Sequence, residues 1–376
     1  MKYYIISGEA SGDLHAANLV KHIFLRDTRA QVRAWGGNLL RQAGACVVKD
    51  YSETAYMGFV EVLTHLRSIV RNFAFCKKDI LTYQPDVVIL VDYPGFNLRI
   101  ARYLHKHKIP VYYYISPQVW AWKKNRVHTI RQNVDEMFVI LPFEQEFYAQ
   151  YGVKVHYFGH PLLDVVQQFK ADADFAGKYV AGERPVVAVL PGSRHQEIKR
   201  MLPVMLAVAG KYKDYQFIIA GVEQHKKLYG QYVHGDNIKI MYNNTYNLLS
   251  HACTAMVTSG TATLETALFN VPQVVCYKAT YLSYYIAKHL VKGIKYISLV
   301  NLIADDDLVK ELIQSDMNVN SLQQELDKIL QGAARNNMLQ KYDRLHQKLG
   351  DGKATEKIVA NMIELLHRKN ARESTE

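Results

Sequence analysis

The sequence has few cysteines and no long apolar run, and each absence excludes a class of protein. There are four cysteines, Cys46, Cys76, Cys253 and Cys276, and they form no Cys-x-x-Cys pair. This usage is typical of a reducing compartment and argues against a disulfide scaffold or a structural zinc site. No apolar stretch reaches the length of about 18 residues that spans a membrane, and the amino terminus lacks a signal peptide's long apolar segment. We therefore expect a cytoplasmic protein.

The first glycine-rich loop lacks the spacing of a dinucleotide site. An apolar strand over 3–7 leads to Gly8-Glu9-Ala10-Ser11-Gly12-Asp13 and then to a helix that ends near Leu25. Because these glycines do not follow the Gly-x-Gly-x-x-Gly pattern, we do not expect an NAD-binding domain. The loop can still approach a ligand, with Glu9 and Ser11 as polar contacts. Glycines in such a turn are also common for packing reasons alone.

The length and the charge of the chain indicate two domains and an anionic partner. Its 376 residues exceed the roughly 250–300 at which a single core stops growing. We expect one domain over 1–168 and a second over 182–350, because the hydrophobic pattern weakens between them. The net charge of +11 favours nucleic acid, a phosphorylated metabolite or an acidic membrane surface.

The segment 253–278 has the pattern of strand, glycine turn, helix and second strand, which is half of a nucleotide-binding unit. Gly260 and Thr261 stand at the helix start, where unpaired N–H groups can hold phosphate oxygens. Glu265 lies one turn into the helix, where its carboxylate can accept two hydrogen bonds from a ribose diol. The alternative is that Thr261 is an ordinary cap and Glu265 only favours the helix dipole.

A second polar turn in this half of the chain follows an apolar strand over 185–190. It reads Pro191-Gly192-Ser193-Arg194, and a guanidinium at this place could clamp a diphosphate bidentately. Asn301 is a polar residue in an otherwise apolar loop, where it would bond either the backbone or a ligand. We expect further strands over 216–221 and 238–242, and helices near 306–314, 321–330, 335–349 and 355–367.

In the first half of the chain, the apolar strand 86–91 ends at Asp92. An aspartate at the carboxyl end of a buried strand lies where α/β proteins do their chemistry, so Asp92 could be a general base; it could instead cap the helix that starts at Pro94. A strand over 111–115 leads to Trp120 and on to Arg126, through a run of further aromatic and basic residues. That mixture could bind nucleic acid, and it equally suits lipid headgroups and phosphosugars.

Met57 and Phe59 lie in an apolar segment that precedes a basic, aromatic-rich helix over about 63–81. Such a helix can lie on an anionic bilayer, or it can be an ordinary amphipathic helix that covers the sheet. The acidic runs at Asp172 and Asp174 and at 305–307 follow no buried strand, so we predict no metal site.

Two βα halves with an acidic strand end in the first and an Arg and Glu pair in the second indicate a two-domain enzyme with a cleft. That is the α/β architecture of GT-B glycosyltransferases, in which two Rossmann-like domains face each other and the last helix, here about 353–369, crosses back to the first domain. Nine segments in order resemble the lipid-A-disaccharide synthases: SGEASGD (7–13), YMGFVEVL (56–63), VDYPGFN (91–97), ISPQVWAW (115–122), LPFE (141–144), FGHP (158–161), LPGSR (190–194), SGTATLE (259–265) and SLVNLIA (298–304).

This resemblance implies a bacterial inverting glycosyltransferase that needs no metal and no cofactor. It would condense UDP-2,3-diacylglucosamine with 2,3-diacylglucosamine 1-phosphate to a β-1,6-linked disaccharide 1-phosphate and release UDP. It implies Asp92 as the general base with Glu9 as a second catalytic residue. Arg194 and Asn301 would join Gly260, Thr261 and Glu265 in binding the UDP-sugar.

The resemblance also changes the partners we expect. Ser11, Met57, Phe59, Trp120 and Arg126 become contacts to the acceptor or its acyl chains, since each buried CH₂ contributes about 0.8 kcal/mol. The positive charge is then explained by UDP, a sugar phosphate and the anionic inner-membrane surface, with no nucleic acid. We expect a peripheral protein on the cytoplasmic face of that membrane, and the resemblance implies a homodimer.

Two departures and two alternatives accompany the resemblance. Gly95 stands where the family often has a second acid, which leaves Asp92 as the only carboxylate of that motif, and Val300 stands where proline is common. One alternative is a UDP-N-acetylhexosamine 2-epimerase on the same fold, which needs no acceptor and no membrane-facing residues. The other is a non-enzymatic basic protein that binds membrane or nucleic acid with strong salt dependence.

Overall fold

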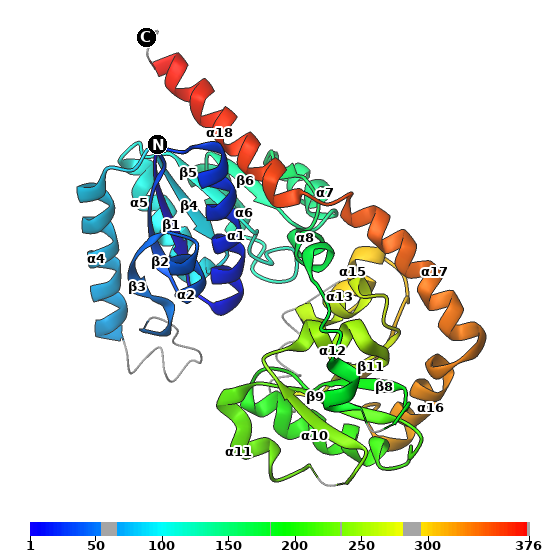
Figure 1. Cartoon of the computed structure of the whole chain (residues 1–376). Helices are drawn as coiled ribbons and strands as arrows, with labels where there is room; N and C mark the ends of the chain where they lie inside the picture. Colours follow the sequence, from blue (N-terminus) through cyan, green and yellow to red (C-terminus); the bar gives the residue numbers. More distant parts are fainter. Residues whose placement is uncertain (54–65, 181, 234, 281–294, 374–376) are drawn as a thin grey trace. The chain divides into compact units, whose positions relative to one another are not determined.

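The computed structural model describes residues 1–53, 66–180, 182–233, 235–280 and 295–373. The chain forms two compact units: unit 1 comprises residues 1–161 together with 352–376, and unit 2 comprises residues 162–351. Each unit is built on one parallel β-sheet with helices packed against it (Figure 1). The predicted α/β class is confirmed.

Unit 1 contains a seven-stranded sheet in the order β3-β2-β1-β4-β5-β6-β7, and all of its neighbouring strands are parallel. Its strands are β1 (Lys2–Ser7), β2 (Gln31–Gly36), β3 (Cys46–Asp50), β4 (Val87–Val91), β5 (Val111–Tyr114), β6 (Glu136–Val139) and β7 (His156–Tyr157). The chain runs from β1 towards one edge and from β4 towards the other, so the order reverses between these two strands.

The core of unit 1 lies on both faces of this sheet, because successive side chains of a strand point to opposite faces. Tyr3 and Ile5 of β1 are buried in a cluster with α1 (Ala10–Arg26), whereas Tyr4 and Ile6 are buried on the other face with α4 (Leu66–Tyr83) and α5 (Pro94–Lys106). Burial on both faces explains why these strands are apolar without alternation. The remaining short helices of this unit include η1 (Tyr51–Glu53), α2 (Asn38–Gln42), α6 (Arg126–Asn133) and α7 (Glu144–Ala149).

The last helix, α18 (Ala354–Glu373), belongs to unit 1 although unit 2 precedes it in the chain. Its apolar face packs beside α1, as Figure 1 also shows. The residues that it contributes to the core cluster are Ile358, Val359, Met362 and Leu366. The crossing of the final helix back to the first domain, which GT-B architecture predicts, is therefore confirmed.

Unit 2 contains a six-stranded parallel sheet in the order β10-β9-β8-β11-β12-β13. Its strands are β8 (Val186–Leu190), β9 (Gln216–Gly221), β10 (Ile238–Tyr242), β11 (Ala252–Thr258), β12 (Gln273–Tyr277) and β13 (Lys310–Ile313). The order again reverses once, between β8 and β11. The helices and 3-10 turn are α8 (Pro161–Gln168), α9 (Phe175–Tyr179), α10 (His195–Ala209), η2 (Glu223–His225), α11 (Lys226–Tyr229), α12 (Thr245–His251), α13 (Thr261–Leu268), α15 (Leu299–Ala304), α16 (Val319–Leu330) and α17 (Gly332–Leu349).

The predicted helix over 306–314 is wrong, because this segment contains the edge strand β13. Its acidic start at 305–307 resembles the first turn of a helix, but Val274–Tyr277 of β12 pairs with Lys310–Ile313 in parallel register. The expected loop around Asn301 is instead the helix α15. The weakly patterned segment before β8 contains α8 and α9, and Phe175 of α9 is buried in the core of unit 2.

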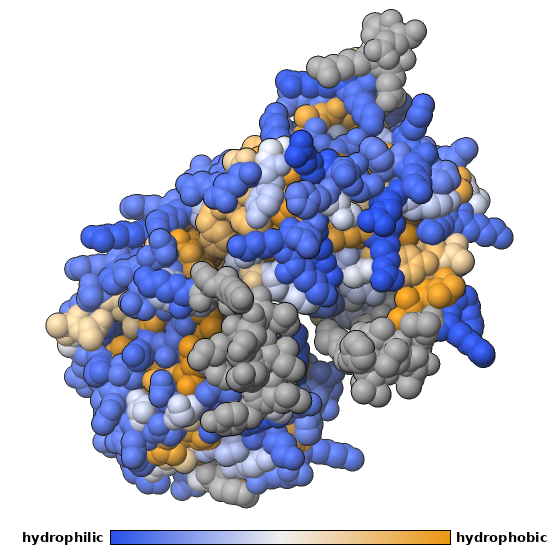
Figure 2. Space-filling model, turned by 180° about the vertical axis from the view of Figure 1, so that it is seen from behind, coloured by the Kyte–Doolittle hydropathy of each residue, from blue (hydrophilic) through white to orange (hydrophobic). Residues whose placement is uncertain are grey.

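Met57 and Phe59 lie outside the described residues, so their predicted lipid contacts have no structural counterpart here. Within the part of the chain that is described, no helix has both the length and the apolar composition needed to cross a membrane. Most of the surface seen in Figure 2 is hydrophilic, and apolar residues show in small separate patches.

Candidate functional site

The two reversals of strand order place the predicted residues of each unit at one sheet edge. In unit 1, Ser7 at the end of β1 pairs with Val91 at the end of β4, so the loops that carry Glu9 and Asp92 leave the sheet side by side. In an open α/β sheet this point is where ligands bind, because the two loops diverge and leave space at the carboxyl edge. The structure thus brings together two residues that are 83 positions apart in the sequence.

Asp92 has an unusual electrostatic environment for a carboxylate. Its side chain is largely withdrawn from water, and this desolvation, to which the negative charge of Glu9 adds, raises the pKa of Asp92 to about 6. A hydrogen bond from the Tyr93 backbone opposes the rise without cancelling it. A carboxylate whose pKa lies near the working pH has the basicity that general-base catalysis requires.

The backbone at Asp92 is left-handed at two successive residues. Asp92 has φ +43° and Tyr93 has φ +50°, conformations that residues other than glycine seldom adopt. The ring of Tyr93 lies against Gly8, where a Cβ would stand 2.3 Å from a ring carbon, so only glycine fits beside it. The first-loop glycine is therefore needed for close packing, and the loop and the Asp92 turn fix each other.

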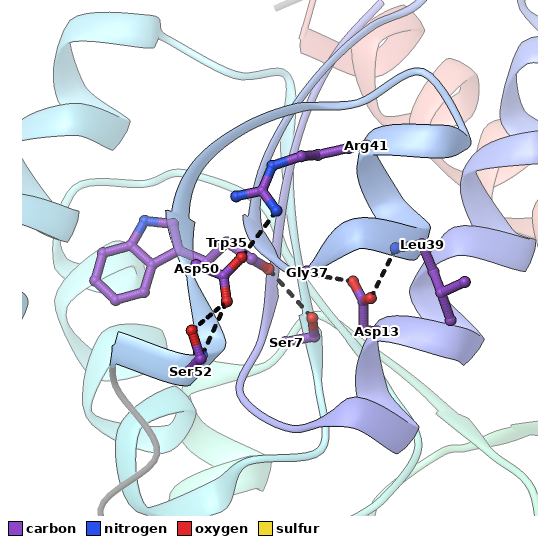
Figure 3. Close-up of polar contacts among 8 residues, drawn as sticks. All are labelled: Ser7, Asp13, Trp35, Gly37, Leu39, Arg41, Asp50 and Ser52. Atoms are coloured by element: carbon purple, nitrogen blue, oxygen red, sulfur yellow. Dashed lines mark hydrogen bonds and ion pairs between the residues drawn. The ribbon is translucent and has the colours of Figure 1, made fainter. Parts of the chain in front are cut away.

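Asp13, the other acid of the first loop, has a structural role. Its carboxylate accepts the N–H of Gly37 at 2.6 Å and that of Leu39 at 3.0 Å, which caps the short helix α2 (Figure 3). The Ser7 hydroxyl donates to the carbonyl of Trp35 in the same region (Figure 3). These bonds join the end of β1 and the start of α1 to the end of β2 and the start of α2. Ser11, by contrast, is exposed.

The tryptophan-rich loop that follows β5 presents its second tryptophan to solvent. Trp122 is 40% exposed, and both Lys123 and Arg126 hold their cationic groups over its ring, at 4.5 and 5.5 Å. Trp120 is half-buried and meets the ring of Phe143 edge to face, with centroids 5.0 Å apart. Of the two predicted contacts, Arg126 thus lies at the exposed aromatic surface, while Trp120 anchors the loop.

In unit 2 the pairing of Val257 with Leu190 places the turn after β8 beside the turn after β11. Arg194 therefore lies at the same sheet edge as Gly260. Its side chain is 68% exposed, and the ion pair that it makes within the described part of the chain is with Glu197, at 3.3 Å. The Glu197 carboxylate also accepts the N–H groups of Ser193 and Arg194, so it caps α10 and leaves the guanidinium at the surface.

The start of α13 is open where the start of α10 is capped. Gly260 precedes α13 with φ +152°, and among the described residues no side chain caps the helix and no atom lies within 4 Å of a Cβ built at Gly260. Thr261 is exposed. Ser259 turns away, because its hydroxyl donates to the carbonyl of Ile297 at 2.8 Å. A phosphate can therefore approach the N–H groups of this helix closely.

Glu265 lies on α13 with its carboxyl group withdrawn from water, which raises its pKa. The hydroxyl of Tyr246 on α12 donates to Glu265 Oε1 at 2.8 Å and opposes that rise. Tyr246 is not among the residues predicted from the sequence, because no motif around it indicates a site. The ring of Tyr246 is itself packed between Phe169 and Phe269, at 5.7 and 5.3 Å.

Asn301 is fully buried, and its amide bonds the protein on both sides. Its nitrogen donates to the carbonyl of Val309 and to Glu311, and its oxygen accepts the N–H groups of Leu308 and Val309, all within 3.0 Å. These bonds tie α15 to the start of β13. If Asn301 contacts the UDP-sugar as predicted, its amide must replace one of these four hydrogen bonds by a bond to the ligand.

Comparison with known proteins assigns the chain to a family. The model of the family described as lipid-A-disaccharide synthetase matches residues 3–363. The chain belongs to this family. The lipid-A-disaccharide synthase of Syntrophus aciditrophicus is 40% identical over 96% of this chain and 97% of its own length. Those of Geobacter sulfurreducens and Nitrosococcus oceani are 37% and 39% identical, covering 96% and 93% of this chain and 96% and 92% of their own.

Solved structures with the same fold include both isomerases and glycosyltransferases. The UDP-GlcNAc 2-epimerase of Neisseria meningitidis, solved with UDP-GlcNAc, matches with a TM-score of 0.71 at 13% identity, over 97% of this chain and all of its own. A calicheamicin glycosyltransferase matches with a TM-score of 0.62 at 16% identity, over 98% of each chain. At such low identity these likenesses show the GT-B fold alone. The family membership makes the chain a glycosyltransferase of lipid A biosynthesis and does not favour the epimerase alternative.

Proposed function

We propose that this enzyme transfers 2,3-diacylglucosamine from UDP to the 6-hydroxyl of 2,3-diacylglucosamine 1-phosphate, and that Asp92 is the base of the reaction. Membership of the lipid-A-disaccharide synthetase family supports the lipid-linked sugar substrates. The observation that carries the role of Asp92 is its place at the strand reversal of unit 1, beside Glu9 and with a pKa raised to about 6.

The proposed reaction is a single displacement with inversion. Asp92 takes the proton of the acceptor hydroxyl as that oxygen attacks the anomeric carbon of the donor. The bond from this carbon to the diphosphate oxygen breaks, and its electron pair leaves with UDP. Glu9 keeps Asp92 basic through its negative charge, and its own carboxylate can orient a sugar hydroxyl of the acceptor.

The donor nucleotide binds unit 2 in this proposal. Gly260 and Thr261 bring the helix-start N–H groups of α13 to the diphosphate, and the exposed Arg194 neutralises the charge that grows on it as UDP leaves. Glu265 accepts the ribose hydroxyls, with Tyr246 holding one of its oxygens. Asn301 stabilises the carboxyl edge of the unit 2 sheet through its hydrogen bonds to the backbone directly before β13.

The acceptor binds unit 1. Arg126 and Lys123, which share the ring of Trp122, offer two cations to the 1-phosphate, and the aromatic face offers an apolar surface to the sugar or its acyl chains. Ser11 is exposed in the first turn of α1, directly after Glu9, and can donate to a sugar hydroxyl. Trp120 supports the loop from within.

The test of this proposal is a product analysis with a matched pair of variants. We expect the purified protein, mixed with both substrates in detergent micelles, to release UDP and a diacylglucosamine disaccharide phosphate in equal amounts by mass spectrometry. Asp92→Asn should lower turnover by about 10²–10⁴, the usual range for a general base, with UDP binding unchanged. Asp86→Asn, at the other end of the same strand, should leave turnover unchanged. Full activity of Asp92→Asn would refute the assigned role.

Association with an anionic membrane is the further part of this proposal. On α4, Val70 is 63% exposed and Phe75 43% exposed, and exposed Arg67, Arg71 and Lys78 lie on the same helix. An apolar and basic helix of this kind inserts its apolar side chains and attracts anionic headgroups. Flotation with vesicles that contain phosphatidylglycerol should decrease in Val70→Ser/Phe75→Ser, whereas Leu25→Ser, at an exposed leucine on α1, should float like the unchanged protein. Sedimentation would test the homodimer that the family resemblance implies.

A further inference from the structure

The turn that carries Asp92 is held by two buried side chains outside the proposed reaction. The carbonyl of Asp92 accepts a hydrogen bond from the hydroxyl of Tyr113 at 2.5 Å and another from the amide nitrogen of Asn97 at 2.8 Å. Tyr113 on β5 and Asn97 on α5 both have no exposed surface. Two donors therefore converge on one carbonyl oxygen immediately after β4, where the backbone becomes left-handed.

The contacts of Asn97 extend this attachment across the strand reversal. Its amide nitrogen also lies 3.3 Å from the carbonyl of Val91 and 3.4 Å from that of Ile6, at the ends of β4 and β1. The N–H of Asp92 donates to the carbonyl of Tyr114 at 3.1 Å. The peptide groups on both sides of the Asp92 Cα are thus fixed to two elements of unit 1, β5 and α5, and Asn97 also links them to β1.

Such bonds matter because the conformation they hold is unfavourable. Asp92 and Tyr93 are both left-handed, and neither is glycine. A non-glycine residue in this region is strained, and it persists only where its surroundings over-determine it, which is common at functional sites. If the carbonyl were released, the Asp92 peptide could relax towards an ordinary turn, and its carboxylate would move away from the strand reversal.

We propose that Asn97 and Tyr113 are positioning residues that hold the Asp92 peptide left-handed and so aim its carboxylate at the acceptor hydroxyl. This inference rests on the proposed role of Asp92. Neither residue contacts substrate in it, and both act only through Asp92. Tyr113 also links the Asp92 turn to the segment after β5 that carries Trp122 and Arg126. Arg126 lies near enough for its charge to act on the Tyr113 hydroxyl.

A double-mutant cycle tests this dependence. Tyr113→Phe removes only the hydroxyl and keeps the buried ring, and Asn97→Ala removes the second donor. Each should lower kcat by about tenfold, the effect of one hydrogen bond, with the Kd of UDP unchanged because UDP binds unit 2. In the Asp92→Asn background neither should lower kcat further, since residues that act as a unit are not additive. Tyr112→Phe, at the neighbouring buried tyrosine of β5, is the control and should be fully active.

The outcomes separate this inference from the proposed function. If Asp92→Asn loses turnover while Tyr113→Phe and Asn97→Ala stay fully active, the positioning role is refuted and the role of Asp92 stands. If the losses multiply in the double variants, the two residues support the fold in general and not Asp92, which also refutes the inference. If Asp92→Asn itself is fully active, the general base has been misassigned and the positioning role falls with it. Melting temperatures near that of the unchanged protein exclude loss of folding as the cause.

Discussion

The Tyr246 hydroxyl donates a 2.8 Å hydrogen bond to one carboxylate oxygen of Glu265, and no other described residue bonds the second oxygen. Tyr246→Phe should therefore weaken UDP binding by about tenfold, the usual effect of losing one hydrogen bond to a charged group. The loss should be smaller for UDP that lacks the 2′-hydroxyl, because that ligand makes fewer bonds to Glu265. Isothermal titration of both nucleotides measures this difference.

Tyr215→Phe is the control for this prediction. Tyr215 lies immediately before β9, at the amino edge of the sheet and so at the opposite edge from Glu265. Its variant should bind both nucleotides like the unchanged protein. Equal UDP affinity in Tyr246→Phe and Tyr215→Phe would contradict the assigned role of the Tyr246 hydroxyl.

Arg194→Ala should weaken UDP binding and lower turnover together, because its guanidinium is largely exposed, pairs with Glu197 alone among the described residues, and is available to the diphosphate. We expect a loss of about tenfold or more in UDP affinity, and a smaller salt dependence of the remaining binding. Lys199→Ala removes the same charge from an exposed position of α10 and should change neither quantity. Unaltered UDP titrations in Arg194→Ala would exclude this residue from the site.

The pH dependence of kcat/KM should report the environment of Asp92. The base acts in its ionised form and its pKa is raised to about 6, so kcat/KM should fall as the pH drops through about 6. Since the negative charge of Glu9 contributes to this rise, Glu9→Gln should lower the pKa of Asp92 and move the acid limb to lower pH. Glu53→Gln, at an exposed acid of the same unit, should leave the limb in place. A limb that stays fixed in Glu9→Gln would show that another group titrates.

Gly95 offers a test of the acid that the family often has there. Gly95 is exposed, and a Cβ at this position would meet no described atom within 4 Å, so the side chain of Gly95→Asp can start there without a clash. We expect this variant to be as active as the unchanged protein. We also expect that Gly95→Asp will not restore turnover to Asp92→Asn, because only Asp92 lies on the strained turn at the end of β4. Recovery of turnover in the double variant would transfer the role of base to position 95.

His15 and His160 should make unit 1 sensitive to acid. Burial lowers the pKa of His15 to about 4 and, with the charge of His15 adding to the effect, that of His160 to about 3. The unfolded chain then binds protons that the folded chain does not, so stability should fall as the pH drops from about 6.5 towards these values. For His15 alone the loss is on the order of 3 kcal/mol.

Melting temperatures between pH 7 and pH 4 measure this loss. His15→Gln should flatten the dependence, since the substituted side chain does not titrate. Asn18→Ala, at a half-buried position of the same helix whose side chain does not titrate, should leave the dependence as it is. An unchanged pH profile in His15→Gln would place the acid sensitivity elsewhere in the chain.

The sequence predicted those parts of the site that a short apolar strand and its following turn define. Asp92, Arg194 and Gly260 each end or follow such a strand, and parallel pairing then places them at the carboxyl edges. Tyr246 and Tyr113 could not be predicted in this way. Each donates a hydrogen bond from its hydroxyl to a partner that is distant in the chain. Because the chain has 26 tyrosines, residue type alone does not distinguish these two from the others.

The two wrong secondary-structure predictions, a helix over 306–314 and a loop around Asn301, also arise from contacts between distant residues. The segment around β13 is polar and acidic at its start, and only its pairing with β12 makes it a strand. The loop predicted around Asn301 is the helix α15, and the N–H groups of Leu308 and Val309 bond the Asn301 side-chain oxygen there. In both cases tertiary contacts decide the outcome, and local pattern does not contain them.

The return of α18 to unit 1 has a consequence for the biosynthesis of the chain. Arg26 of α1 pairs with Glu356 of α18, and 330 positions separate them. At a synthesis rate of about 5–20 residues per second, the apolar side of α1 waits roughly 15–65 s on the ribosome for the helix that covers it. Throughout that time nascent unit 1 exposes a surface on which chaperones can act, and a prematurely terminated chain would keep it exposed.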